Sequence, residues 1–333
     1  MTTTATRVSD RFELVTFPRV AGEPTFGQEI AAGLRAAPKR LSPKFLYDDV
    51  GSALFDAITR LPEYYPTRAE TDILREWGWE MVRLLDAPLD FLELGSGSAV
   101  KTRILIEEAL RVQRTLRYSP IDISADALRV SSQNLVDSYR ELSIRAYAGD
   151  YFDVLSSGVL RLQRKTLAMF MGSNIGNYEP AEARRILKLL AGVLRPGDGL
   201  LLGLDLKKDR GILELAYDDP AGVTAAFDRN VLSRINRELG GDFNVRDFDH
   251  VVRYDEGRGS VDSFLEARRD MRVTLAEIGV YLTFGRGERI RVESSYKFSA
   301  ADIAALAAGA GFRVAQAWTD GAEAFSVSLL VRE

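Results

Sequence analysis

Two glycines that directly follow a short apolar segment are the residues whose spacing points most clearly to chemistry. Leu89-Asp-Phe-Leu-Glu-Leu94 is expected to form a strand, Gly95 and Gly97 follow it, and a helical pattern begins near residue 99. Glycines let the backbone turn sharply at the carboxyl end of a strand, where open α/β sheets hold their ligands. A cofactor can lie there against bare backbone. The segment therefore predicts a binding site for a nucleotide-like cofactor.

The composition excludes several other kinds of chemistry. The 333 residues include no cysteine, which rules out disulfides, thiol catalysis and cysteine-ligated metals. The one histidine, His250, argues against a histidine-rich metal site or a Ser-His-Asp triad, and we interpret it as structural. A net charge of −4 gives no reason to expect nucleic acid or an anionic membrane as a partner. Without a secretory leader or an apolar run of about 18 residues, we expect a cytoplasmic protein.

The elements that would position the glycine turn alternate regularly. Strands are expected at 89–94, 117–122, 143–148, 166–171 and 199–205, with helices at 68–85, 99–113, 125–138 and 180–194. Such alternation is typical of an α/β fold with a mainly parallel sheet. Residues 1–25 are expected to be loosely ordered, and 28–60 to form two helices around a proline-containing loop.

The pattern changes after residue 206. Helices are expected within 209–240 and antiparallel strands at 247–254, 260–270 and 290–297; then follow a helix at 300–309 and strands at 312–318 and 325–331. Ser299 and Asp302 have the spacing of a helix-capping pair. We expect the last elements to rejoin the first sheet. This predicts a Rossmann-like cofactor-binding domain of residues 70–205 plus 298–333, and a second α+β, substrate-binding domain of residues 1–69 plus 206–297.

The type of turn discriminates between cofactors. Val100 occupies the third glycine position of the NAD motif, and the P-loop pattern is absent. Glu93-Leu-Gly-Ser-Gly-Ser98 instead resembles the first motif of class I S-adenosylmethionine-dependent methyltransferases. The resemblance implies that Asp122, at the end of the second strand, binds the ribose and that Asp150 meets the adenine amine. It also implies a closing hairpin after the fifth strand.

A closer resemblance covers nearly the whole chain from about residue 28. It is carried by Lys44-Phe-Leu-Tyr-Asp-Asp-Val-Gly-Ser52, Leu61-Pro-Glu-Tyr-Tyr-Pro-Thr-Arg68, Gly172-Ser-Asn-Ile-Gly-Asn177 and Glu293-Ser-Ser-Tyr-Lys-Phe298. These segments are similar to the L-histidine Nα-methyltransferase family. The resemblance implies conversion of L-histidine to its Nα-trimethylated form (hercynine), the precursor of ergothioneine. It also implies three methyl transfers from S-adenosyl-L-methionine, with S-adenosyl-L-homocysteine as the product and no metal.

The resemblance also assigns residues to roles. Tyr47 would lie near the substrate amine and could help to deprotonate it, and Asn177 would hydrogen-bond the amine and carboxylate; these two are the catalytic candidates. Tyr217 would bind the carboxylate, while Glu293 and Ser295 would recognise the imidazole. The residues implied for the cofactor are Tyr64, Gly95, Gly97, Lys101, Asp122, Asp150 and Tyr151.

One departure leaves the amino-acid side chain open. Ser263 aligns, within about a residue, where histidine-specific members often carry a bulkier apolar side chain against the imidazole, so the pocket could be larger here. The alternative substrate is another aromatic amino acid, such as tryptophan. Two further alternatives are a catalytically inactive binding module and an NAD-dependent oxidoreductase. We expect a monomer that acts on a small molecule.

Each assigned residue also has an ordinary structural interpretation. A lone tyrosine is often a core residue with a satisfied hydroxyl, Asp122 could simply cap a helix, and Lys101 could be solvated. Methyl transfer from a sulfonium is an in-line displacement, and it needs positioning and an uncharged amine. Those needs fit a chain without cysteine.

Overall fold

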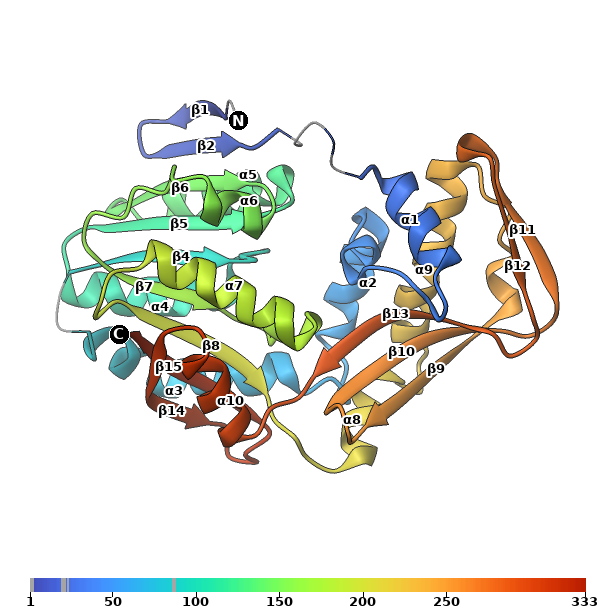
Figure 1. The fold of residues 1–333 in the computed structure, drawn as a ribbon. Helices are drawn as coiled ribbons and strands as arrows, with labels where there is room; N and C mark the ends of the chain where they lie inside the picture. Colours follow the sequence, from blue (N-terminus) through green and yellow to red (C-terminus); the bar gives the residue numbers. More distant parts are fainter. Residues whose placement is uncertain (1–2, 19–21, 23, 86–87) are drawn as a thin grey trace. The chain divides into compact units, whose positions relative to one another are not determined.

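The computed structural model describes residues 3–18, 22, 24–85 and 88–333. The chain divides into two compact units (Figure 1). The first unit comprises Met1–Ala21, Arg68–Leu206 and Phe298–Glu333, and the second comprises Gly22–Thr67 and Lys207–Lys297. In the described ranges, none of the helices is long and apolar enough to cross a membrane.

The first unit is built on a nine-stranded sheet. In spatial order its strands are β1 (Thr4–Ser9), β2 (Phe12–Thr16), β6 (Leu142–Ala148), β5 (Leu116–Asp122), β4 (Leu89–Leu94), β7 (Lys165–Phe170), β8 (Gly199–Asp205), β15 (Phe325–Arg332) and β14 (Phe312–Thr319). The run from β2 to β8 is parallel, whereas β1, β15 and β14 are antiparallel to their neighbours. The mainly parallel sheet and its closing hairpin are as predicted.

Helices cover both faces of this sheet, which explains why the central strands β4, β7 and β8 are buried along almost their whole length. Helices α3 (Pro66–Arg83), α4 (Val100–Val112) and α5 (Ala125–Ser138) pack on one face; α6 (Tyr151–Ser156), α7 (Pro180–Val193) and α10 (Ala300–Ala308) pack on the other. In β4, Leu89 and Phe91 face the first layer while Leu92 and Leu94 face the second. Strands buried on both sides are the rule in parallel sheets.

The amino-terminal segment differs from the expectation. Residues 1–25 were expected to be loosely ordered and to belong to the second domain; residues 1–2, 19–21 and 23 lie outside the described residues. The prediction of loose order is wrong, because β1 and β2 form a hairpin, and β2 pairs in parallel with β6 from Phe12↔Ile144 to Thr16↔Ala148. Phe12 and Leu14 are fully buried. Their alternation is short and lies within a threonine-rich segment, which hides the strand signal.

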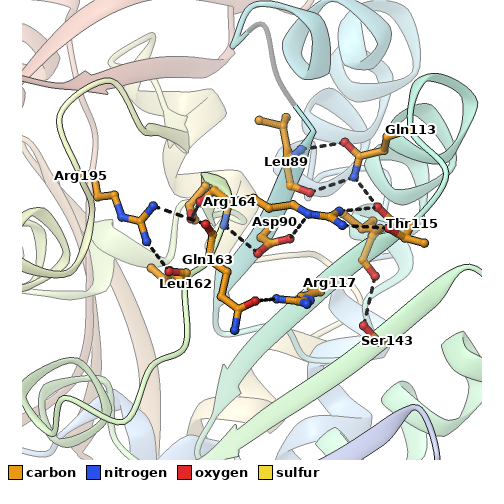
Figure 2. A network of polar contacts seen from close by, with 12 residues as sticks. Leu89, Asp90, Gln113, Thr115, Arg117, Ser143, Leu162, Gln163, Arg164 and Arg195 are labelled. Carbon is orange, nitrogen blue, oxygen red and sulfur yellow. Dashed lines mark hydrogen bonds and ion pairs between the residues drawn. The ribbon is translucent and has the colours of Figure 1, made fainter.

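Polar contacts fix the loops at the edge of the sheet where β4 and β7 begin (Figure 2). The Gln113 amide exchanges hydrogen bonds with the backbone N–H and C=O of Leu89, at 2.8 and 2.9 Å. The Arg164 guanidinium donates to the Thr115 carbonyl and hydroxyl, and its backbone N–H donates to Asp90. The glycine turn lies at the other end of β4.

The second unit combines a four-stranded sheet with helices. The sheet order is β3 (Lys39–Arg40), β13 (Arg289–Tyr296), β10 (Ser260–Ala267) and β9 (Phe248–Asp255); a separate hairpin, β11 (Met271–Leu275) with β12 (Val280–Phe284), was not predicted. The helices are α1 (Phe26–Arg35), α2 (Asp49–Ile58), α8 (Arg210–Tyr217) and α9 (Val223–Leu239). Helix α9 lies against β9 and β10.

Strand register places three residues of this sheet in one row. Ser263 of β10 lies opposite Val252 of β9 on one side and opposite Glu293 of β13 on the other. Directly opposed residues of antiparallel strands project from the same face. The row therefore places Glu293 beside Ser263.

Candidate active site

The glycine turn after β4 has a backbone that only glycine adopts easily. Gly95 and Gly97 have φ of +70° and +48°. A Cβ at Gly95 would lie 2.6 Å from the Tyr151 hydroxyl and 3.1 Å from the Asn174 amide nitrogen, whereas Gly97 faces open space. The requirement at Gly95 is therefore both conformational and steric. The turn thus places the Tyr151 phenol and the Asn174 amide next to the Gly95 backbone.

Asp122 ends β5 and holds this turn in place. Its carboxylate accepts the Gly97 N–H at 3.1 Å and the Ser124 N–H at 3.0 Å. Burial raises the pKa of Asp122, and these backbone hydrogen bonds oppose that shift. The interpretation of Asp122 as a helix cap is wrong, because Ser124 is the N-cap of α5; Asp122 instead holds its carboxylate at the glycine turn.

Asp150 and Tyr151 approach the same turn from the end of β6. Asp150 is exposed and caps α6 by accepting the Phe152 N–H at 2.8 Å. The Tyr151 ring packs edge-on against Phe170, with centroids 5.6 Å apart. Burial raises the pKa of Tyr151 well above the usual value, and the charge of Asp122 adds to the effect. The predicted cofactor residues of the first unit therefore gather at the carboxyl end of the sheet.

Lys101 is paired with Glu70, a residue that the sequence analysis missed. Glu70 lies on α3, is fully buried, forms an ion pair with the Lys101 ammonium and accepts the Gly172 N–H at 2.8 Å. The missed signal is an acid within the apolar stripe that continues at Ile73 and Leu74. Lys101 is thus tied to the segment after β7.

A second buried acid lies beneath the turn. Glu93 accepts hydrogen bonds from Thr102 at 2.8 Å and from the Tyr118 hydroxyl. Burial raises the pKa of Glu93 to about 7. Its partners on α4 and β5 make it a support for the turn.

Asn177 lies in the short helical turn η2 (Asn174–Asn177) that follows β7. It is half-buried, and Asn174 in the same turn lies closer to Gly95. The turn is entered through Ser173 with φ of +55°, and the Ser173 hydroxyl accepts the Asp205 N–H at 3.1 Å. The turn after β7 therefore offers the carboxamides of both Asn174 and Asn177 as hydrogen-bonding groups.

In the second unit, five aromatic rings form a continuous cluster. Tyr47 makes edge-on contacts at 5.4 Å with both Phe55 and Phe227, Phe55 contacts Tyr64 at 6.2 Å, and Tyr64 contacts Tyr217 at 6.1 Å. Tyr64 is the one predicted cofactor residue that lies in the second unit, among the predicted substrate residues.

Tyr217, Ser295 and Lys297 form a buried polar triangle. The Tyr217 hydroxyl donates to the Ser295 hydroxyl at 2.8 Å, and the Lys297 ammonium donates to both oxygens at 2.8 Å. Lys297 is 2% exposed and lies over the Tyr217 ring. Sequence reasoning did not single out Lys297, although it belongs to the motif that begins at Glu293. The triangle brings a positive charge to two predicted substrate residues.

Glu293 is buried in a way that suits ligand binding. Among the residues that the structure describes, none donates a hydrogen bond to its carboxylate, and the opposed Ser263 hydroxyl is likewise without a partner. Burial and the charge of Asp228 raise the pKa of Glu293 to about 8, while Lys297 and His250 act in the opposite direction. A buried carboxylate without a hydrogen-bond donor is costly unless a ligand supplies one.

His250 lies between two aspartates. Its Nε2 is 2.8 Å from Asp228 Oδ2, and its Nδ1 is 3.4 Å from Asp218 Oδ1. The side chain is 2% exposed, and the two carboxylates raise its pKa against the opposing effect of burial. Asp228 interrupts the buried stripe of α9 that continues at Val231 and Leu232, a signal that sequence reasoning also missed.

Comparison with known proteins agrees with this arrangement. A family model described as histidine-specific methyltransferase, SAM-dependent, matches residues 26–332. The histidine N-alpha-methyltransferase of Mycolicibacterium smegmatis is 44% identical over 305 residues, 92% of this chain and 94% of that protein. The protein of the same name from Mycobacterium tuberculosis is 43% identical over 313 residues, 94% of this chain and 96% of that protein. Ergothioneine biosynthesis protein 1 of Neurospora crassa is 30% identical over 331 residues, 96% of this chain but 36% of that longer protein.

The family match extends over both units, and the first unit has the parallel sheet and closing hairpin expected of class I methyltransferases. The fold-class prediction is confirmed. With the glycine turn and its acids at the carboxyl end of the sheet, and with relatives that align along almost their whole length, the chain belongs to the histidine-specific, S-adenosylmethionine-dependent methyltransferases and is an amino-acid N-methyltransferase.

Proposed function

We propose that the enzyme transfers three methyl groups in succession from S-adenosyl-L-methionine to the α-amino nitrogen of L-histidine, giving hercynine. The histidine assignment rests on Glu293. Its carboxylate is buried and receives no hydrogen bond from the residues that the structure describes. The names of the two mycobacterial relatives support the same substrate.

The first unit supplies the residues for the cofactor. The bare turn at Gly95 and Gly97 offers backbone, Asp122 a carboxylate for the ribose hydroxyls, and Asp150 an acceptor for the adenine amine. Tyr151 closes the turn beside Gly95. When bound, the cofactor supplies a methyl carbon attached to a positively charged sulfur, and the nearby acids are compatible with that charge.

Lys101 suits the cofactor's carboxylate, because its ammonium is held beside Gly172. Glu70 keeps the ammonium in that place. For Tyr64 we retain the predicted cofactor contact, although its ring packs on Tyr217.

The second unit supplies residues for the amino acid. Glu293 would accept or share the imidazole proton, and the Ser295 hydroxyl would bind a ring nitrogen. Tyr217 would bind the carboxylate, with the Lys297 charge hydrogen-bonded to its hydroxyl. Asn177 belongs to the first unit, and for it we retain the predicted hydrogen bonds to the amine and carboxylate.

Tyr47 would orient the amine as a neutral hydroxyl. Although 38% of its surface is exposed, burial around the hydroxyl and the Glu293 charge raise its pKa well above the usual value. A phenol held in its neutral form can accept an N–H, but it is a poor proton sink. The aromatic cluster around Tyr47 suits a quaternary ammonium product through cation–π contact, which favours completion of three transfers.

Ser263 is the residue on which the alternative substrate depends. It is 1% exposed and faces Glu293, so a small side chain stands where a larger one would narrow the pocket. If tryptophan is the better substrate, Ser263→Met should shift the preference toward histidine.

We infer further that the enzyme acts as a monomer in the cytoplasm, on a free amino acid and without a metal. Light scattering on the purified protein tests the oligomeric state. A chelator that removes activity would contradict the metal-free reaction.

A time course of purified protein with S-adenosyl-L-methionine and L-histidine, followed by mass spectrometry, tests the proposal. Mono-, di- and trimethylated histidine should appear in sequence, with the trimethylated form remaining at the end. A stable monomethyl product under excess cofactor would contradict the three-transfer account.

A further inference from the structure

We propose that Asp228 is the proton acceptor of the reaction and that His250, the single histidine of the chain, is the positioning residue that holds it. The inference deepens the proposed function and rests on it. It concerns two buried titratable side chains for which neither the sequence motifs nor the predicted site has a use.

A proton acceptor is required by stoichiometry. The substrate amine is an ammonium at neutral pH, and only its unprotonated form can attack the methyl carbon. One N–H bond must therefore break for each methyl transferred, and three protons must leave for each hercynine formed. Tyr47 is a poor candidate for this proton acceptor, because its raised pKa keeps the side chain in the neutral phenol form.

The geometry of Asp228 meets this requirement. Its side chain is fully buried on α9, its Oδ2 accepts from His250 Nε2 at 2.8 Å, and its Oδ1 has no hydrogen-bond partner within the described part of the chain. One oxygen is thus fixed and the other left unoccupied. This is the arrangement of an oriented carboxylate base.

Asp228 also lies beside the residues assigned to the substrate. The Tyr47 ring packs at 5.4 Å on Phe227, the residue preceding Asp228. The Asp228 charge acts on both the Tyr47 hydroxyl and the Glu293 carboxylate, raising the pKa of each. Asp228 is therefore close to the predicted positions of both the amine and the imidazole.

The proposed proton transfer runs from the substrate ammonium to the unoccupied oxygen of Asp228. In the step, the N–H bond breaks and an O–H bond forms at Asp228 Oδ1. The electron pair left on nitrogen forms the N–C bond, and the C–S bonding pair stays on sulfur. Asp228 then returns its proton to water before the next transfer.

His250 fixes which oxygen is unoccupied. The groups facing the imidazole are Asp228 from α9, Asp218 from the end of α8 and the charge of Glu293 from β13. Carboxylates lie at both ring nitrogens, since Asp218, whose side chain is 58% exposed, is close to Nδ1. They favour the doubly protonated imidazolium, which donates from Nε2 to Asp228.

The test compares Asp228→Asn, His250→Asn and the control Asp72→Asn, on the exposed side of α3, for kcat, KM for histidine and pH profile. We expect D228N to lose about 10²- to 10⁴-fold in kcat. Its remaining activity should rise about tenfold per pH unit until the amine is free. H250N should lose about tenfold in kcat with a similar pH trend, and D72N should change little.

Binding of S-adenosyl-L-homocysteine and thermal melting show whether each variant is folded. If D228N is folded and keeps the wild-type kcat and pH profile, the inference is overturned while the proposed function stands. If D228N does not fold, H250N decides: a wild-type pH profile in folded H250N overturns the inference. If the wild-type enzyme does not methylate histidine at all, the proposed function fails first, and this inference fails with it.

Discussion

The Tyr217 hydroxyl donates a hydrogen bond to the Ser295 hydroxyl at 2.8 Å, and this contact links two residues predicted for different parts of the substrate. Tyr217 was assigned to the carboxylate and Ser295 to the imidazole. Because Lys297 donates to both, the two parts of the site share one buried positive charge. A substitution at either position should therefore affect the binding of the whole amino acid.

Removal of the Tyr217 hydroxyl should weaken substrate binding more than catalysis. We expect Tyr217→Phe to raise KM for histidine about 10- to 100-fold, the equivalent of one hydrogen bond to a charged group, with a smaller change in kcat. Tyr281→Phe is the matched control, since Tyr281 is 78% exposed. Steady-state kinetics would refute the assignment if both variants behaved alike.

Glu293→Gln should lower the turnover of histidine and raise the stability of the fold at high pH. The pKa of Glu293 is raised to about 8 in the folded enzyme, so the folded state binds more protons than the unfolded state above the ordinary pKa of a glutamate. At low pH the carboxyl group is protonated in both states, so its titration does not change the folding stability. As the pH rises from about 4.5 toward 8, the group increasingly destabilises the folded state.

Thermal melting from pH 5 to 9 measures this effect. The E293Q variant should melt higher than wild type at pH 9, equal it near pH 5, and lose histidine turnover. Glu93, whose pKa is raised to about 7, should leave some pH dependence in the variant. An E293Q variant that melts lower than wild type at pH 9 would show that the carboxylate stabilises the fold.

Gly95→Ala should weaken cofactor binding for steric as well as conformational reasons. The added methyl would meet the Tyr151 hydroxyl and the Asn174 amide. Gly158→Ala is the matched control, because Gly158 has the same kind of backbone, φ +69°, with nothing within 4 Å. Both variants should lose about 1–2 kcal/mol of stability. Calorimetric titration with S-adenosyl-L-homocysteine should show at least a tenfold loss for G95A alone.

Glu70→Gln should weaken cofactor binding although Glu70 is assigned no contact with the cofactor. The amide can still accept the Gly172 N–H, but it leaves the Lys101 ammonium without its counter-charge. We expect about a tenfold loss of S-adenosyl-L-homocysteine affinity. Asp72→Asn, on the exposed side of the same helix, should have no effect; equal effects in both variants would point to helix stability instead.

Local patterns predicted most of the fold because each element carries its own signal. The strand at 89–94, the helix at 125–138 and the strand at 199–205 have the predicted bounds. The hairpins β1–β2 and β11–β12 were missed, since their strands are only five or six residues long and an alternation over so few residues is a weak signal. The glycine turn was found because its backbone conformation is set locally, whereas its acids were assigned through the resemblance to the methyltransferase motif.

The supporting charges could not be found in the same way. Glu70 lies 31 residues from Lys101, Asp228 lies 22 residues from His250, and Lys297 lies 80 residues from Tyr217. These pairings depend on how distant segments pack together. For Glu70 and Asp228 the one local signal is a charged residue on a buried helix face, and that signal does not identify the partner.

The most direct test is mass spectrometry of the purified enzyme incubated with S-adenosyl-L-methionine and an equimolar mixture of the protein amino acids. The account predicts that histidine alone gains three methyl groups. Preferential methylation of tryptophan, or of any amino acid without an imidazole, would contradict the role of Glu293 and transfer specificity to the space beside Ser263.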